Sequence, residues 1–142
     1  SDDGSAIVWD LASGEQRRRL EQDDATYGLA VSRDGGKAVV GDAAGHLIIW
    51  DLDSGAQLRK LAGAGAGMVY SVDISSDGRW GVSAGHDRIV RVWDLATGAE
   101  VARLIGHADR VLDAHFSSSD EKVVSSSWDG TVRVWDVEAV TR

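Results

Sequence analysis

The sequence predicts an all-β fold built from antiparallel hairpins, and three observations carry this prediction. A short stretch ending in Trp-Asp recurs four times along the 142 residues. The first three copies are each followed by Leu, one variable residue, Ser or Thr, and Gly, which is typical of a hairpin turn. Short extended segments and turn-forming residues alternate between these copies, and no segment with helical periodicity is long enough to compete.

Turn-forming residues divide the chain into short strands. The loops 11–14, 52–55 and 95–98 end in a glycine, which can adopt the positive φ that joins two strands tightly. Further turns are predicted at 33–36, 76–78 and, less clearly, 118–121. The predicted strands around these turns span residues 27–32, 37–41, 69–75, 79–84, 111–117 and 122–127.

The Trp-Asp stretches recur with a nearly constant period. Successive tryptophans are 41, 43 and 42 residues apart, at Trp9, Trp50, Trp93 and Trp135. This period and its closing Trp-Asp pair resemble the WD40 repeat, and the resemblance covers essentially the whole chain. It implies a partial WD40 β-propeller made of four-stranded antiparallel blades. The implied units are a partial blade (1–20), two complete blades (21–62 and 63–105) and a blade that lacks its outer strand (106–142).

The last repeat contains two Trp-Asp pairs with different expected positions. Trp135 ends a strand in which valines alternate with other residues, whereas Trp128 lies in the hairpin turn just before that strand. Each propeller sheet is covered on both faces, so Trp9, Trp50, Trp93 and Trp135 are expected to be buried in the blade cores. A tryptophan on a turn gains no such burial automatically.

Similarity to WD40 repeats also implies a buried hydrogen-bonded group that holds a blade together. Its members in the last repeat are His107, Ser125, Asp129 and Trp135. The preceding repeat matches at Ser83, Asp87 and Trp93, but Gly65 or a neighbour replaces the histidine. The repeat that ends in Trp50 departs further, because Val40 and Ala44 stand where Ser and Asp belong.

The residue types of this group also invite a hydrolase interpretation. A nucleophilic serine needs an exposed hydroxyl, an oxyanion hole and an oriented base. Ser125 lies on a strand in the middle of a blade beside an indole, and therefore offers none of these. We expect no catalytic residue and no enzymatic activity, and the Ser/His/Asp hydrolase stays a remote alternative.

Metal and cofactor sites are not expected either. The Asp-Gly turns lack the spacing of a calcium loop, and the four histidines at positions 46, 86, 107 and 115 lie in separate elements without metal-ligand spacing. The glycine-rich segment 63–67 leads into a strand and not into a helix, so it is interpreted as a flexible connection between blades.

Composition excludes several classes of partner. The net charge is −8 and the one basic run, residues 17–19, is followed by acidic residues, so no nucleic-acid partner is expected. No apolar run approaches the roughly 18 residues of a membrane span, so no membrane partner is expected. The absence of cysteine fits a reducing compartment, here the cytoplasm, and the excess of Arg over Lys favours a bacterial source.

A protein-binding face follows from the resemblance. WD40 propellers bind partners on the face formed by the turns before the Trp-Asp strands and by the starts of the innermost strands. The residues expected on this face are Trp128, Tyr70, Tyr27, Met68, His86, Arg110 and Leu112. Trp, Tyr, Met and Arg, which make up most of this set, are enriched at protein interfaces. The alternative is that Trp128 and the tyrosines pack on neighbouring loops. Trp80, which begins a strand, is expected to pack between blades.

The number of blades is too small for a closed ring. About three and a half blades cannot surround an axis, since propellers need about four to eight. We expect a C-terminal piece of a larger propeller protein, with the remaining blades supplied by the missing part of the chain. The alternative is a self-assembling fragment, in which the strand 15–20 of one copy completes the last blade of another.

Overall fold

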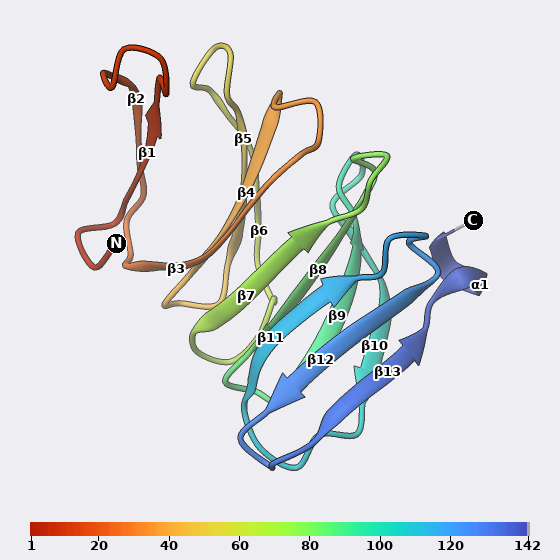
Figure 1. Cartoon of the computed structure of the whole chain (residues 1–142). Helices are drawn as coiled ribbons and strands as arrows, with labels where there is room; N and C mark the ends of the chain where they lie inside the picture. Colours follow the sequence, from red (N-terminus) through yellow and green to blue (C-terminus); the bar gives the residue numbers. More distant parts are fainter. Residues whose placement is uncertain (142) are drawn as a thin grey trace.

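Four antiparallel sheets lie side by side in the computed structural model of the chain, which describes residues 1–141 (Figure 1). The first sheet contains β1 (Ser5–Trp9) and β2 (Gln16–Glu21). The second contains β3 (Thr26–Val31), β4 (Lys37–Asp42), β5 (Leu47–Asp51) and β6 (Gln57–Leu61). The third contains β7 (Val69–Ile74), β8 (Trp80–Gly85), β9 (Ile89–Asp94) and β10 (Ala99–Ile105). The fourth contains β11 (Val111–Phe116), β12 (Lys122–Ser127) and β13 (Val132–Asp136), and the helix α1 (Glu138–Thr141) follows.

Each sheet is a simple meander, in which every strand pairs with the next one along the chain. The innermost strands β3, β7 and β11 contact one another in that order (Figure 1). The predicted all-β fold with four-stranded antiparallel sheets is confirmed. The four-residue helix α1 was not predicted, and β2 extends one residue past the unit boundary expected at residue 20. Among residues 1–141, no helix is long and apolar enough to cross a membrane.

The innermost strands end one residue earlier than predicted. Ser32, Ser75 and Ser117 were predicted to lie in these strands, and that prediction is wrong. The hydroxyl of Ser75 donates to Asp77 and accepts the Trp80 backbone N–H, so this serine begins the turn. A serine hydroxyl that bonds nearby backbone groups favours a turn over a strand.

The aspartate of the Trp-Asp pair builds the turn after its strand. Asp10, Asp51 and Asp94 each accept two backbone N–H bonds, from the residues two and three positions later. These bonds lower the pKa of all three carboxyl groups from the ordinary value. The glycine at the end of each turn has a positive φ, as the hairpin pattern predicted.

Apolar side chains fill the three spaces between successive sheets. Between the first and second sheets lie Leu20, Ala38, Val40, Ile48 and Trp50. Between the second and third lie Val39, Leu47, Ile49, Ala64, Val69, Val72, Trp93 and Leu95. Between the third and fourth lie Val82, Ala84, Val90, Val92, Val111, Ala114, Val123 and Val137. Each core therefore depends on two neighbouring repeats.

Only two of the four repeat tryptophans are fully buried. Trp50 and Trp93 are 6% and 3% exposed, because a neighbouring sheet covers each ring. Trp135 is half-buried, and Trp9 is 54% exposed. The expectation that Trp9 lies in a blade core is wrong for residues 1–141, where none of the sheets covers its ring. Trp80, the tryptophan that begins β8, is buried as expected, at 4% exposure.

Candidate functional site

The expected binding residues lie on the side of the sheets that carries the β4–β5, β8–β9 and β12–β13 turns, and we call this side the turn face. Three of them have the same place in the fold. Tyr27, Tyr70 and Leu112 are the residues skipped by the strand pairing near the starts of β3, β7 and β11. Such a β-bulge turns a side chain away from the regular alternation of the strand and is common beside functional sites.

Bulge geometry leaves these side chains at the surface. Tyr27 is 44% exposed, Leu112 is 40% exposed and Tyr70 is half-buried. The rings of Tyr27 and Tyr70 meet edge to face, with centroids 6.4 Å apart and planes at 80°. The structure thus brings the two tyrosines together across the boundary between two sheets.

Two further pairs of expected residues are joined on the turn face. Trp128 is 61% exposed, its backbone N–H donates to the Arg110 carbonyl at 3.0 Å, and the Arg110 guanidinium lies 5.3 Å from its ring centroid. The His86 N–H donates to the Met68 carbonyl at 3.0 Å. Both bonds tie a turn to the connection that enters an innermost strand. Met68 is 37% exposed, and His86 is exposed.

A hollow of about 640 Å³ separates these two pairs. It is lined by Ala66, His86, Asp87, Arg88, Ala108, Asp109 and Arg110. Arg88 was missed by the sequence analysis, although it stands where the other two turns have Gly45 and Gly130 and so was visible as an irregularity in the repeat.

The four residues expected to hold the last blade together are joined by hydrogen bonds. His107 Nδ1 lies 2.9 Å from Asp129 Oδ2, and His107 Nε2 lies 2.8 Å from Ser125 Oγ. Trp135 Nε1 donates to the same hydroxyl at 2.8 Å. The group connects the loop before β11, strand β12, the β12–β13 turn and strand β13.

This group has the order of a Ser-His-Asp triad but not its accessibility. Ser125 is 1% exposed and His107 is 7% exposed, so the hydroxyl that would attack a substrate is covered. The same hydroxyl oxygen already accepts the indole N–H. A buried, fully bonded group of this kind stabilises one arrangement of the blade, and its geometry argues against the hydrolase alternative.

Asp129 is the anionic end of the group. The Thr131 hydroxyl, the Ala108 backbone N–H and His107 all bond its carboxylate and hold the pKa of Asp129 well below its usual range. Since each of these bonds favours the charged form, the carboxylate stays ionised wherever the blade is folded near neutral pH.

The third sheet holds the same elements together with an arginine. Trp93 Nε1 donates to Ser83 Oγ at 2.9 Å, as the pattern implies, but Asp87 does not join that pair. Asp87 instead accepts a 2.6 Å bond from Arg91, which also donates to the Ala64 carbonyl at 3.1 Å and lies 3.2 Å from Glu100. Arg91 is 5% exposed and thus replaces the missing histidine from strand β9.

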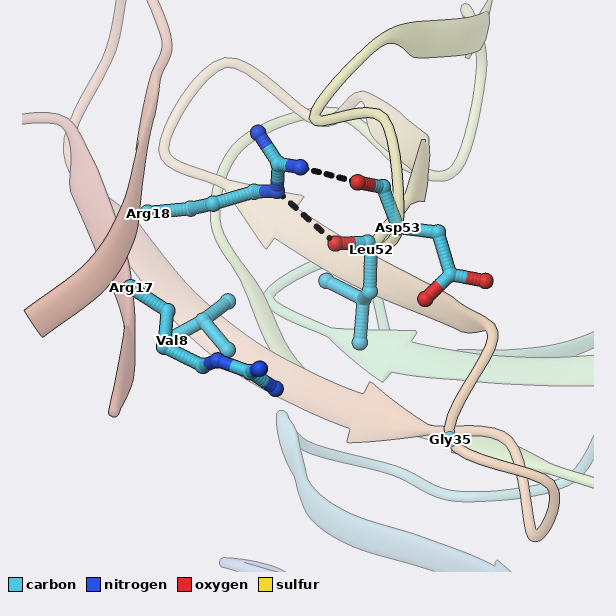
Figure 2. Close-up of a pocket in the computed structure, with 6 residues that line it drawn as sticks. All are labelled: Val8, Arg17, Arg18, Gly35, Leu52 and Asp53. Carbon is cyan, nitrogen blue, oxygen red and sulfur yellow. Dashed lines mark hydrogen bonds between the residues drawn. The ribbon is translucent and has the colours of Figure 1, made fainter. Parts of the chain in front are cut away.

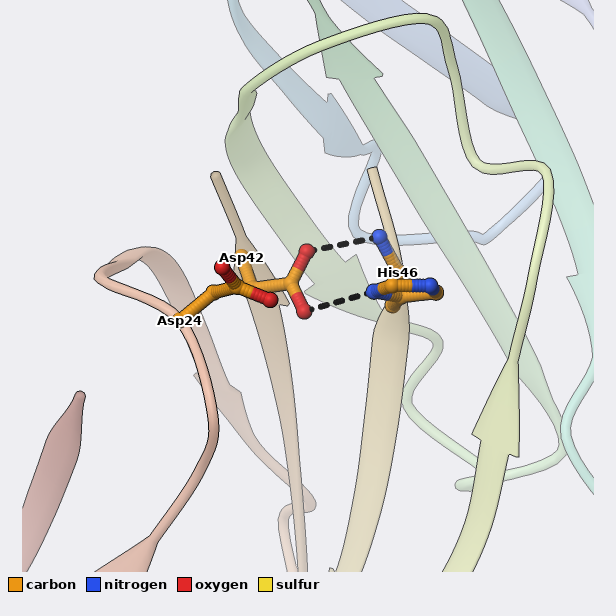
Figure 3. A group of neighbouring side chains, drawn as sticks. All are labelled: Asp24, Asp42 and His46. Atoms are coloured by element: carbon orange, nitrogen blue, oxygen red, sulfur yellow. Dashed lines mark hydrogen bonds and ion pairs between the residues drawn. The ribbon is translucent and has the colours of Figure 1, made fainter. Parts of the chain in front are cut away.

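In the second sheet an aspartate and a histidine at the two ends of the β4–β5 turn bond each other (Figure 3). Asp42 Oδ2 lies 2.8 Å from His46 Nδ1, while Asp42 Oδ1 accepts the Ala44 and His46 backbone N–H groups. Asp24 approaches from the β2–β3 connection, so that ligand atoms of the three side chains lie within 4.8 Å of one another. Because Val40 replaces the serine, Trp50 Nε1 has no hydrogen-bond partner within residues 1–141.

This group was not visible in the spacing of the histidines. His46 has no metal-ligand spacing in the sequence, but the fold brings Asp24 and Asp42 beside it from another loop and strand. His46 already bonds Asp42 through Nδ1, which accounts for the contact as an internal ion pair or hydrogen bond.

A second hollow, of about 310 Å³, lies between the first hairpin and the second sheet (Figure 2). Arg18 donates to the backbone carbonyls of Leu52 and Asp53 across it. Arg17 lines the same hollow and lies 3.6 Å from Asp10. These bonds anchor the two-stranded sheet to its neighbour, on the side opposite the turn face.

Comparison with known proteins agrees with this architecture. The family model of WD40, "WD domain, G-beta repeat", matches residues 55–94 and 98–136. Cilia- and flagella-associated protein 52 of Mus musculus is 25% identical over 135 residues, which cover 95% of this chain and 22% of that protein, and the Sus scrofa protein of the same name gives the same values. The chain thus spans about a fifth of the length of the curated relatives it matches.

A solved structure is similar over nearly the whole chain. The "Structure of U3-55K" superimposes with a TM-score of 0.89 and 27% sequence identity, covering 99% of this chain and 45% of that one. The four sheets described above thus correspond to less than half of that propeller.

Proposed function

Because the chain belongs to the WD40 repeat family and forms part of a β-propeller, we propose that it is a non-catalytic scaffold that binds another protein through its turn face. The observation that carries this proposal is the set of large side chains that reach the surface on that face: Trp128 at 61% exposure, the exposed bulge residues Tyr27 and Leu112, and the half-buried Tyr70. Aromatic and arginine side chains of this kind dominate the energetics of protein interfaces.

The scaffold is proposed to consist of the units 1–20, 21–62, 63–105 and 106–142, with further blades completing the ring. The net charge of −8 supports a protein partner over nucleic acid. A cytoplasmic location is proposed from the absence of cysteine. A bacterial source stays a prediction from composition, and the relatives named above are mammalian.

The test compares two exposed apolar side chains on opposite sides of the sheets. Trp128→Ala removes the proposed anchor, whereas Leu11→Ala removes a residue that is 97% exposed in the β1–β2 turn, on the side away from the turn face. Proteins captured by the wild-type chain are quantified for these two variants and for Tyr70→Ala, after circular dichroism shows that all three fold. We expect Trp128→Ala, and likewise Tyr70→Ala, to lose specific partners that Leu11→Ala retains.

Equal recovery with all three variants would count against the turn face. Loss in every variant would indicate binding that does not depend on this surface. A hot-spot tryptophan is worth at least about 2 kcal/mol of binding free energy, which is a change of more than tenfold in affinity.

A second candidate function, homo-oligomeric assembly, is favoured by the outer face of the fourth sheet. Val124, Val132 and Val134 are 40%, 67% and 63% exposed there, although apolar residues on such a sheet face are ordinarily covered. In the proposed assembly, β2 of one copy pairs with β13 of the next and completes its blade. The strand β1 is then redundant at each junction.

Size-exclusion chromatography with light scattering tests this second candidate. We expect a dimer or larger ring whose population rises with concentration, and a shift toward monomer for Val134→Asp. A folded monomer at all concentrations would exclude the assembly and would leave the turn-face proposal untouched.

A further inference from the structure

The hollow between the β8–β9 turn and the β10–β11 connection is lined by two arginines, of which Arg88 is exposed and Arg110 is half-buried. Two small residues, Ala66 and Ala108, leave the space between the turns open. Within residues 1–141, neither guanidinium forms an ion pair, whereas those of Arg17, Arg19, Arg79, Arg91 and Arg103 do.

Arg88 holds its place at a conformational cost. Its φ of 71° lies in the left-handed region, and the equivalent turn positions are Gly45 and Gly130, with φ of 86° and 80°. Glycine adopts this conformation freely, whereas a residue with a Cβ is strained there. The third repeat thus carries an arginine where folding alone favours glycine, and the arginine side chain is exposed. A strained residue retained in this way points to a function.

Arg110 is held in position from the other side of the hollow. Its guanidinium lies 5.3 Å from the Trp128 ring centroid, and its backbone carbonyl accepts the Trp128 N–H. A guanidinium stacked on an indole keeps its N–H groups free to bind a carboxylate while its orientation is restricted.

The acidic residues that line the hollow are engaged within the protein. Asp87 accepts the 2.6 Å bond from the buried Arg91, and Asp109 accepts the backbone N–H of Arg110 at 2.7 Å. With Asp87 paired to Arg91, the remaining charges of the lining are two guanidinium groups and one carboxylate, so the lining keeps one excess positive charge although the chain carries −8.

We propose that this hollow binds an acidic segment of the protein partner, with a glutamate or aspartate side chain held between Arg88 and Arg110. The inference rests on the proposed function, since it names the chemistry that the turn face recognises. Guanidinium groups match carboxylates in geometry and form charge-assisted hydrogen bonds with them.

Fluorescence anisotropy with labelled hexaglutamate, against hexaglutamine as the neutral control, tests the proposal on the full chain. We expect hexaglutamate to bind more tightly, and Arg88→Gly and Arg110→Gln each to weaken it about tenfold. Arg59→Ala is the matched control, because Arg59 is an exposed arginine on β6, away from the hollow. Arg88→Gly is further expected to unfold at the wild-type temperature or above, since glycine relieves the positive φ.

Three outcomes would overturn the proposal. These are equal affinity for the two peptides, an equal loss with Arg59→Ala, and tighter binding of a DNA oligonucleotide of the same charge, which would assign the hollow to nucleic acid. Partner capture that depends on Trp128 but not on Arg88 would overturn the acidic ligand alone and leave the turn-face scaffold standing.

Discussion

The third and fourth sheets carry the same residue types on the face toward the following sheet, but only one of the two faces is covered. Three valines of the third sheet, Val82, Val90 and Val92, are at most 1% exposed between two sheets. The residues at the same distances from the repeat tryptophan in the fourth sheet are the valines 124, 132 and 134, which are 40%, 67% and 63% exposed. A repeat thus encodes a face suited to burial, while burial itself requires the next sheet.

The two sheets also differ in how the entering loop is attached to the turn. In the fourth sheet the imidazole ring of His107 bridges Asp129 and Ser125. In the third sheet the guanidinium of Arg91 bridges Asp87, Glu100 and a backbone carbonyl. The common requirement is a group that joins the loop to the turn, and the two blades supply it from different places: the loop before β11 carries His107, whereas strand β9 carries Arg91.

The largest expected effect comes from charging equivalent valines of the two sheets. Val92→Asp places a carboxylate in a fully buried site and should destabilise the chain by about 4 kcal/mol or more. Val134→Asp should change the unfolding free energy by only about 0.5 kcal/mol, because the side chain is exposed. Urea denaturation of both variants measures the difference. Similar losses would mean that the outer face of the fourth sheet is covered in solution.

The second-largest loss of stability is expected on replacing the buried Arg91 of the third sheet. Arg91→Met leaves Asp87 and Glu100 without their buried partner, so we expect a loss of about 3 kcal/mol. The matched variant is Arg133→Met, at the same position of the fourth sheet, where the guanidinium lies over Trp135 at 6.0 Å and is exposed. Its loss should stay below about 1 kcal/mol. Equal losses would show that Arg91 does not hold the loop.

Much of the fold was predictable because it follows from local chemistry repeated in phase. The Trp-Asp period, the turn glycines and the alternating strands each place one element. The strand ends differ by one residue: the innermost strands end before a serine whose hydroxyl starts a turn, while β4 and β8 end one residue later than predicted. The exposure of Trp9 could not be read from its repeat, because the burial of a residue depends on which sheets lie beside it. Trp9 and Trp93 share a motif, yet one is exposed and the other is not.

The candidate site was predictable to a smaller extent. Aligning the repeats placed Tyr27, Tyr70 and Leu112 near the starts of the three innermost strands. The bulge that brings these side chains to the surface is a property of strand pairing, which the alignment does not contain. Arg91 was missed because the expected donor was sought in the loop, whereas the guanidinium reaches that loop from a strand. Asp24 and His46 meet only after folding, since more than 20 residues separate them in the sequence.

A smaller effect is expected from the two serines that accept an indole N–H. Ser125→Ala leaves both Trp135 Nε1 and His107 Nε2 without a partner and should cost about 2 kcal/mol. Ser83→Ala leaves only Trp93 Nε1 without one and should cost about 1 kcal/mol. Thermal unfolding of the two variants gives the ranking, and a larger loss for Ser83→Ala would contradict the assignment of two bonds to Ser125.

The most subtle difference between the sheets is expected in the dependence of stability on pH. Bonds from Thr131, Ala108 and His107 lower the pKa of Asp129 in the folded state, so its charged form contributes stability above the unfolded pKa of about 4 and loses it progressively as the pH falls below that value. Asp129→Asn removes this contribution. The variant should therefore be less stable than the wild type at pH 7 and should lose less stability between pH 5 and pH 2.

The wild type and the Asp129→Asn variant share the lowered pKa values of Asp10, Asp51 and Asp94, so the contributions of these three residues cancel in the comparison of the two proteins. Thr131→Val sharpens it, because that variant keeps the carboxylate but lacks the hydroxyl that contributes most to the lowered pKa, so its pH slope should lie between the other two. Urea denaturation at several pH values measures the three slopes. Identical slopes would mean that the Asp129 carboxylate is no better stabilised in the folded blade than in the unfolded chain, and that the bonds drawn to it contribute nothing to holding the fourth sheet together.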